Sequence, residues 1–189
     1  GGTTIEGNII SNADRGITFQ TYDSGSSVPA SAYKSIVNNY IADTTSDGIY
    51  SAKADHSMVK GNRIYGAGGH GIYYDGSGDD IVIAENMVVG STGHGIYIDE
   101  EVNRFTIVGN VVLNSGSASA DRRGIGLSAA NSRSIGIISG NVVTDTRDVK
   151  YQDYGLYLRS VASCIISNNY LAGNKTGGIQ YYSTVMSYL

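Results

Sequence analysis

A short motif recurs seven times along this chain, and it restricts the fold more than any other feature of the sequence. Each copy centres on an asparagine that has aliphatic neighbours, and a loop then leads to a glycine that is followed by another aliphatic residue. Regular copies are 23 or 24 residues apart, and the longer gaps reach 31. Repeats of roughly 20 to 50 residues are typical of solenoids, because one unit cannot bury its apolar face alone. The asparagines are Asn8, Asn39, Asn62, Asn86, Asn110, Asn141 and Asn169. The glycines are Gly16, Gly48, Gly71, Gly95, Gly124, Gly155 and Gly178.

Three aliphatic columns accompany the repeat. The residues three positions before each asparagine are Ile5, Ile36, Val59, Ile83, Ile107, Ile138 and Ile166. The residues two positions after it are Ile10, Ile41, Ile64, Val88, Val112, Val143 and Leu171. The residues directly after each glycine are Ile17, Ile49, Ile72, Ile96, Ile125, Leu156 and Ile179. Most are β-branched, which favours strands, and side chains alternate along a strand. We therefore expect three short strands per copy, with one inward face, stacked into a continuous core. Helices are excluded, because glycine interrupts the short apolar runs and no helical period is present.

The recurrent asparagine predicts a sharp corner between two of these strands. Asparagine tolerates the left-handed backbone region, and a glycine or a second asparagine often precedes it here. Its side-chain amide can also bond the asparagine of the next copy. We expect an asparagine ladder along this corner.

Composition narrows the class of protein. The net charge of −4 provides no surplus of basic residues, which argues against binding to nucleic acid. No apolar run has the roughly 20 residues of a membrane helix, so no membrane partner is expected. Cys164 is the single cysteine, which excludes an internal disulfide. The chain starts and stops inside the repeat, so we expect one domain, residues 1–189, from a longer protein.

The motif at residues 5–10 and the run at residues 71–74, each with six further copies, resemble the right-handed parallel β-helix family. That family includes pectate and alginate lyases, polygalacturonases, mannuronan epimerases and phage tailspike depolymerases. The resemblance implies an all-β, right-handed solenoid of about seven coils with a polysaccharide as its target. It also implies an extracellular or virion-surface location and, by likeness to tailspikes, a homotrimeric parent protein.

Departures from the regular spacing predict three long loops, at residues 20–34, 114–123 and 144–154. The last two occur at the same point of adjacent copies, directly before the strand that follows the glycine. Loops on a rigid scaffold often carry function, although a tolerated surface insertion is an equal alternative.

The outward side of the strand after each glycine is rich in tyrosine. Tyrosine offers a flat apolar face for a sugar ring and a polar hydroxyl, and arginine and aspartate offer directional hydrogen bonds. The alternative is that tyrosine simply favours strands and stacks on itself between coils. The residues predicted to bind substrate are Tyr50, Tyr73, Tyr97, His70, Arg123, Asp153, Tyr157 and Arg159.

Asp75 and Asp99 occupy equivalent positions in neighbouring copies, so their backbones should lie about 4.8 Å apart. Two carboxylates about 5 Å apart have the geometry of a retaining glycosidase. We predict them as the catalytic pair, with His94 beside them to tune their ionisation. Solvated turn acids are the alternative, as is a Ca²⁺ site in the oxygen-rich residues 75–80; no other cofactor is predicted. His70 and His94 could also be a general base, a Zn²⁺ pair or simply duplicated repeat residues.

Two functions are therefore open. The first is a polysaccharide-binding and polysaccharide-degrading β-helix, a tailspike-like hydrolase or lyase. In a lyase, Arg122, Arg123 and Arg159 would be the nearest candidates for the base. The second is a non-catalytic shaft or carbohydrate-binding module of a virion fibre or an extracellular surface protein.

Overall fold

The computed structural model describes residues 2–20, 33–52, 55–76, 78–100, 102–118, 122–128 and 134–182. Within these residues the chain forms strands and turns and no helix, so the all-β prediction is confirmed. Most of the predicted loop at residues 20–34 lies outside the described residues, as do Ser77 and Asp121.

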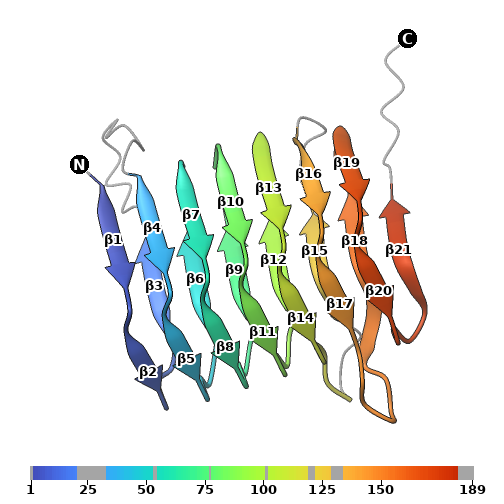
Figure 1. The fold of residues 1–189 in the computed structure, drawn as a ribbon, viewed down its shortest axis with the longest axis horizontal. Coiled ribbons are helices and arrows are strands. Elements are labelled where there is room, and N and C mark those ends of the chain that lie inside the picture. The colour runs from blue at the N-terminus through green and yellow to red at the C-terminus, as the bar shows by residue number, and fades with distance from the viewer. Residues whose placement is uncertain are drawn as a thin grey trace.

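The strands form three parallel sheets of seven strands each, and each copy of the repeat gives one strand to every sheet. Sheet A contains β1 (Thr3–Glu6), β4 (Lys34–Val37), β7 (Ser57–Lys60), β10 (Ile81–Ala84), β13 (Arg104–Val108), β16 (Ile135–Ser139) and β19 (Ser163–Ser167). Sheet B contains β2 (Ile9–Ser11), β5 (Tyr40–Ala42), β8 (Arg63–Tyr65), β11 (Met87–Val89), β14 (Val111–Leu113), β17 (Val142–Thr144) and β20 (Tyr170–Ala172). Sheet C contains β3 (Ile17–Gln20), β6 (Ile49–Ala52), β9 (Ile72–Asp75), β12 (Ile96–Asp99), β15 (Arg122–Ser128), β18 (Gln152–Arg159) and β21 (Gly177–Tyr182). The coils follow one another along the long axis of the molecule, from the N-terminal end to the C-terminal end (Figure 1).

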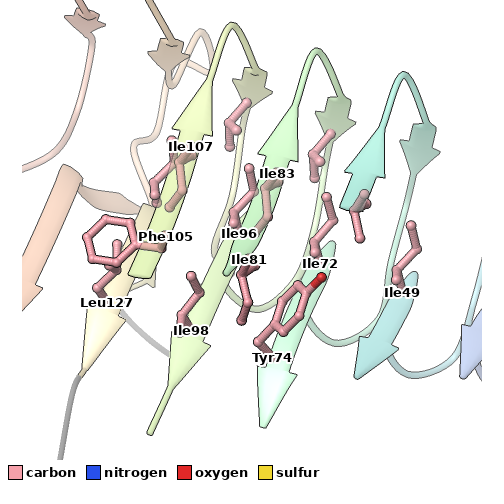
Figure 2. Close-up of a cluster of buried hydrophobic side chains, with 14 of the residues drawn as sticks. Ile49, Ile72, Tyr74, Ile81, Ile83, Ile96, Ile98, Phe105, Ile107 and Leu127 are labelled. Carbon is pink, nitrogen blue, oxygen red and sulfur yellow. The ribbon is translucent and has the colours of Figure 1, made fainter. Parts of the chain in front are cut away.

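The predicted columns are stacked in register. Ile83 pairs with Ile107, and Ile107 pairs with Ile138, on adjacent strands of sheet A. All three side chains are fully buried. Figure 2 shows how isoleucines of successive coils, among them Ile72 and Ile96 of sheet C, line the interior. Each coil therefore buries its apolar residues against the same residues of the next coil.

The predicted asparagine ladder is present at the corner between sheets A and B. The Nδ2 of Asn86 donates to Oδ1 of Asn110 at 3.0 Å and to the backbone oxygen of Val59 at 2.8 Å. The backbone N–H of Asn86 donates to the same Oδ1 at 3.0 Å. Six such side-chain links join the seven asparagines. Because the central asparagines are buried, each polar group depends on these partners.

The sequence had suggested that the ladder asparagine itself adopts the left-handed conformation. In the structure the residue before it does so. The residues with positive φ are Gly7, Asn38, Gly61, Glu85, Gly109, Gly140 and Asn168. The ladder asparagine stays outside the left-handed region because its amide must face the neighbouring coils. Glu85, at a φ of 55°, is the single residue in this row that is neither glycine nor asparagine.

A second corner is held by Asp145, whose carboxylate is buried in the loop at residues 144–154. Arg147 forms two hydrogen bonds with this carboxylate, at 2.8 and 2.7 Å, and the backbone N–H groups of Tyr151 and Gln152 donate to it at 2.9 and 3.0 Å. Burial alone raises the pKa of Asp145, but the hydrogen bonds from Arg147 and the backbone outweigh it and lower the pKa to about 2. Arg147 also donates to the Ser115 backbone oxygen of the previous coil at 2.7 Å. This loop is therefore a fixed element of the fold.

Replacing Ile107 by alanine should lower the free energy of unfolding by about 2 to 5 kcal/mol, because the change removes burial and leaves a cavity. Urea denaturation of both proteins measures the difference. Exposed Ile9, at 82% exposure, gives the matched control, since Ile9→Ala removes the same atoms from a solvated position. Equal losses at the two positions would contradict the stacked core.

Replacing Glu85 by glycine should raise the free energy of unfolding by up to about 1 kcal/mol, because glycine adopts a positive φ without steric cost. The change also removes an exposed ion pair with Lys60, at 3.3 Å, which contributes little. Gly140→Ala is the reverse test. It should destabilise the fold through backbone strain, because its φ is 64°, while an added Cβ would meet only the backbone nitrogen of Gly109, at 4.0 Å. Thermal denaturation checks both changes, and a destabilised Glu85→Gly would refute this account.

Candidate functional site

A row of stacked tyrosines lies on the outer face of sheet C. Tyr50, Tyr73 and Tyr97 pair with one another across β6, β9 and β12. The ring centroids of Tyr50 and Tyr73 are 5.6 Å apart, and those of Tyr73 and Tyr97 are 5.7 Å apart, with the latter two planes only 19° from parallel. The rings of this column are thus in contact across three coils, but Tyr50 is buried and meets Tyr73 edge to face, so the partly exposed rings are those of Tyr73 and Tyr97.

One arginine lies over the first tyrosine of this row, and another lies over a tyrosine farther along sheet C. The guanidinium of Arg15 lies 4.0 Å from the ring centre of Tyr50. The guanidinium of Arg123 lies 4.3 Å from the ring centre of Tyr157. Such cation–π contacts hold the cation and the ring together. Arg123 and Tyr157, predicted separately as binding residues, are therefore one unit.

Gly126 occupies the tyrosine row between Tyr97 and Tyr157. A Cβ at this position would lie 3.0 Å from the ring of Tyr97. The absence of a side chain therefore lets the Tyr97 ring pack against the backbone of β15. The contacts between tyrosine rings therefore end at Gly126, and beyond it the Tyr157 ring is paired with Arg123.

Asp75 and Asp99 are register partners on β9 and β12, as predicted. The Tyr50 hydroxyl donates to Oδ2 of Asp75 at 2.8 Å. Burial, followed by the charge of Asp99, raises the pKa of Tyr97. Burial, followed by the charges of both aspartates, raises the pKa of Tyr73. The tyrosine hydroxyls thus stay protonated beside the two carboxylates, and that of Tyr50 donates to one of them.

A chain of hydrogen bonds runs along the residues that precede the glycines of sheet C. Oδ1 of Asp47 accepts the backbone N–H of His70 at 2.8 Å. Nδ1 of His70 then accepts the backbone N–H of His94, and Nδ1 of His94 accepts that of Arg123, both at 2.8 Å. The two imidazoles are parallel, with centroids 5.1 Å apart. Each side chain therefore provides an acceptor for the next coil.

These bonds define the protonation of both histidines. An Nδ1 that accepts a hydrogen bond carries no proton, so the neutral ring has its proton on Nε2. Burial, followed by the neighbouring His70 and Arg123, lowers the pKa of His94 to about 2. Burial also lowers the pKa of His70. The general-base role considered from the sequence needs a free ring lone pair, which this arrangement does not offer. His94 instead lies buried with its ring 4.4 Å from that of Tyr97.

The remaining predicted residues lie in the C-terminal half of the same sheet. Arg159 is exposed and continues the row of Asp75 and Asp99 through Ser128. Asp153 accepts a hydrogen bond from the hydroxyl of Thr176 on the following coil. The structure thus brings Asp75, Asp99, the histidines and the other tyrosines together on coils two to four. Coils five and six hold Arg123, Asp153, Tyr157 and Arg159.

Sequence reasoning did not select Arg15, Asp47 or Gly126, although all three belong to the columns that it identified. Arg15 and Asp47 share the column of the histidines, and they contact each other at 3.4 Å. Their position in that column was the available signal. Two surface hollows of about 280 and 270 Å³ lie elsewhere, next to Asn38 and Arg63 and next to Phe19 and Lys34.

No metal centre emerges from the described part of the chain, where no group of three or more His, Cys, Asp or Glu side chains could hold an ion. In the segment considered for Ca²⁺, Asp80 pairs with Arg104, and Asp79 accepts a hydrogen bond from Asn103. Across the same residues, no helix is long and apolar enough to cross a membrane.

Residues 1–121 match the family model of the right-handed β-helix region, and the chain belongs to this family. Among solved structures, the chain is similar to the A-module of the mannuronan C-5 epimerase AlgE6 of Azotobacter vinelandii, with 14% identity and a TM-score of 0.46. This match covers 93% of the chain and 58% of the epimerase module, so the chain spans less than two thirds of that structure. It is also similar to the surface protein and adhesin PfbA of Streptococcus pneumoniae, with 10% identity, a TM-score of 0.25 and coverage of 79% and 69%. No curated protein matches the chain.

Acid should destabilise the protein through His94. Its folded pKa of about 2 is below the unfolded value of about 6.5, so the stability that His94 contributes is present above pH 6.5 and is lost as pH falls towards 2. The expected slope is about 1.4 kcal/mol per pH unit for this one proton. His94→Asn retains an acceptor without a titrating group, so its unfolding free energy should fall less steeply between pH 6.5 and 5. His94→Leu should be less stable at every pH. Equal slopes for wild type and His94→Asn, measured by urea denaturation, would contradict this assignment.

Proposed function

We propose that the protein binds a polysaccharide along the outer face of sheet C. The observation that carries this proposal is the row of contacting rings of Tyr50, Tyr73 and Tyr97, in which Tyr73 and Tyr97 are stacked and partly exposed, with the pair of Arg123 and Tyr157 farther along the same face. A tyrosine presents an apolar face to a sugar ring and a hydroxyl to its oxygens. The row repeats at about 4.8 Å along the rod, which suits an extended chain better than a compact ligand.

The polar groups beside the row support the same ligand class. Arg159 and Arg123 provide donors for hydroxyl or carboxylate oxygens, and arginine binds carboxylates in a bidentate manner. His70, whose Nδ1 is occupied, offers its Nε2–H as a further donor. Asp153 provides an acceptor near the C-terminal end. The β-helix fold agrees with this function by analogy alone, because many enzymes with the fold act on polysaccharides.

We extend the proposal to chemistry at Asp75 and Asp99. These carboxylates are one strand spacing apart, about 4.8 Å between backbones, on the same outer row. In a hydrolase one of them would protonate the leaving oxygen while the other attacks as nucleophile or activates water. A carboxyl separation close to this backbone spacing would give retention. His94 would act as a positioning residue, because it contacts Tyr97, which lies two residues before Asp99 on β12. A lyase would instead use an arginine of the cluster Arg122, Arg123 and Arg159 as base.

A second candidate function is a carbohydrate-binding module or shaft without catalysis. One observation favours it: Asp75 already has a tyrosine hydroxyl, that of Tyr50, as its partner. The carboxylates would then orient the aromatic row. For either function we propose an extracellular or virion-surface location, where a binding face of this length can meet polysaccharide.

Tyr73→Ala should weaken polysaccharide binding by about tenfold, because it removes the central ring of the row. Affinity electrophoresis against a panel of capsule and cell-wall polysaccharides measures the loss. Tyr170→Ala is the matched control, since Tyr170 is exposed on sheet B and faces another side of the rod. Equal binding by wild type and Tyr73→Ala would exclude the tyrosine row as the binding surface.

Asp99→Asn should abolish chain shortening while binding and thermal stability remain close to those of wild type, because the change removes charge and keeps shape. Size-exclusion analysis of the polysaccharide scores turnover, and ultraviolet-absorbing unsaturated ends distinguish a lyase from a hydrolase. Asp148→Asn, at an exposed loop position, is the control. Full activity in Asp99→Asn would eliminate the carboxylate-pair mechanism. Wild-type binding without any turnover would favour the non-catalytic module.

A further inference from the structure

A surface hollow of about 280 Å³ lies at the corner between sheets A and B, on coils two and three. The residues that line this corner hollow are Asn38, Asn39, Tyr40, Gly61 and Arg63. Asn38 and Gly61 are successive members of the row with positive φ. A Cβ on Gly61 would lie 2.4 Å from Oδ1 of Asn38, so a side chain at position 61 would collide with the wall of the hollow.

One wall of the corner hollow is aromatic. Tyr40, the first residue of β5, is 42% exposed. Its ring centre is 5.6 Å from that of Tyr65 on β8, with 35° between the ring planes. Tyr65 is itself held in place, because its hydroxyl donates to Sδ of Met87 at 3.2 Å. The Tyr40 ring is therefore supported by a neighbouring ring and remains accessible to a ligand with an apolar face.

The corner hollow also contains an exposed cation. Among the first and last residues of the seven strands of sheet B, Arg63 is the single charged one. None of the ion pairs within the described residues includes Arg63. The nearby charges of Lys60 and Glu85 compensate each other at 3.3 Å. In a chain with a net charge of −4, this arginine therefore presents a local positive charge to an anionic group.

An amide completes the set of groups that can bind a ligand. The Asn39 amide belongs to the ladder, because its Nδ2 donates to Oδ1 of Asn62 at 3.0 Å and to two backbone oxygens. The neighbouring Asn38 lies outside the ladder and lines the hollow with its own amide. A side-chain amide offers both donors and an acceptor, which suits hydroxyl groups.

The size and chemistry of the corner hollow select one class of ligand. Sites for drug-sized molecules have about 300 to 1,000 Å³, so a hollow of about 280 Å³ suits a single ring. A neutral sugar would leave Arg63 without a counter-ion, and an inorganic anion would make no use of the Tyr40 ring. A pyranose with a carboxylate has an apolar face, hydroxyls and an acid, so it matches Tyr40, Asn38 and Arg63 together.

We propose that the corner hollow binds a single pyranose ring that carries a carboxylate. The sugar ring lies against Tyr40, its carboxylate pairs with the Arg63 guanidinium, and a hydroxyl bonds the Asn38 amide. The hollow lies at the corner of sheets A and B, so this site is separate from the proposed polysaccharide surface on sheet C. Either site can therefore exist without the other.

Nuclear magnetic resonance titration of the 189-residue chain tests the proposal. Glucuronic acid should shift the backbone amide signals of Gly61 and Arg63 with a dissociation constant of about 1 mM, since a ligand of this size gains little more. Glucose has a hydroxymethyl group in place of the carboxylate, and it should bind about tenfold more weakly. Equal affinity for the two sugars overturns the proposal, and so do shifts confined to sheet C.

Arg63→Gln should lower the affinity for glucuronic acid about tenfold, to that of glucose, and leave the glucose affinity unchanged. Arg104→Gln removes another exposed arginine, on β13 of sheet A, and this control should bind glucuronic acid like wild type. Equal losses in the two variants would mean general charge attraction and overturn the assigned site. Asn38→Gly is a variant that keeps the fold, because glycine adopts the φ of 56° without strain, and it should weaken both sugars. Unchanged affinity for both sugars in Asn38→Gly overturns the assigned contact.

Two further ligands identify the group that the hollow recognises. Inorganic phosphate should not displace glucuronic acid at equal concentration, and full displacement identifies a simple anion site and overturns the sugar ligand. The methyl glycoside of glucuronic acid distinguishes the two sources of an acidic ring. Binding as tight as that of glucuronic acid assigns the hollow to the end of an acidic chain, and weaker binding assigns it to the free sugar; both results support an acidic pyranose.

Discussion

Stacking of like residues on like residues, one strand spacing apart, is the constraint on which the structure depends. Because the strands of successive coils pair in parallel register, every inward isoleucine meets an equivalent residue above and below. The same register places asparagine on asparagine at the corner between sheets A and B, where six side-chain links satisfy amides that would otherwise be buried without partners. The residue type at each position of this fold thus depends on the equivalent residues of the adjacent coils as much as on its own neighbours in the chain.

The outer face of sheet C follows the same rule with different chemistry. Tyrosines stack along one column, and the column beside the glycines passes a backbone hydrogen bond from coil to coil through Asp47, His70 and His94. In this second column an aspartate oxygen and two imidazole nitrogens do the same work, because each offers an acceptor at the same place. Structural ladders and a candidate binding surface therefore share residues, and a change in one affects the other.

Much of the fold could be predicted from the sequence, because a repeated column leaves a pattern that is visible without a structure. The three aliphatic columns and the asparagine ladder are examples. The positive φ of Glu85 could not be predicted, because the sequence does not show which of two adjacent residues at this corner adopts the left-handed conformation. The hydrogen-bonded pair of Asp145 and Arg147 lies in a loop that is not repeated, so no repeated pattern in the sequence predicted it. The acceptor role of His94 depends on a side-chain torsion and on a backbone N–H of the next coil. The roles of Asp75 and Asp99 in catalysis remain predictions, because shared columns also place residues in pairs without chemistry.

The asparagine ladder also has a direction. In every link, from Asn8 to Asn39 and onward to Asn169, the Nδ2 of the earlier coil donates to the Oδ1 of the later one. The amide dipoles consequently point the same way, and each polarises the next, as in a chain of aligned hydrogen bonds. The rod therefore has an electrical polarity along this corner, with amide hydrogens oriented toward its C-terminal end and carbonyl oxygens toward its N-terminal end. A feature that began as a way to satisfy buried amides makes the two ends of the solenoid electrostatically different.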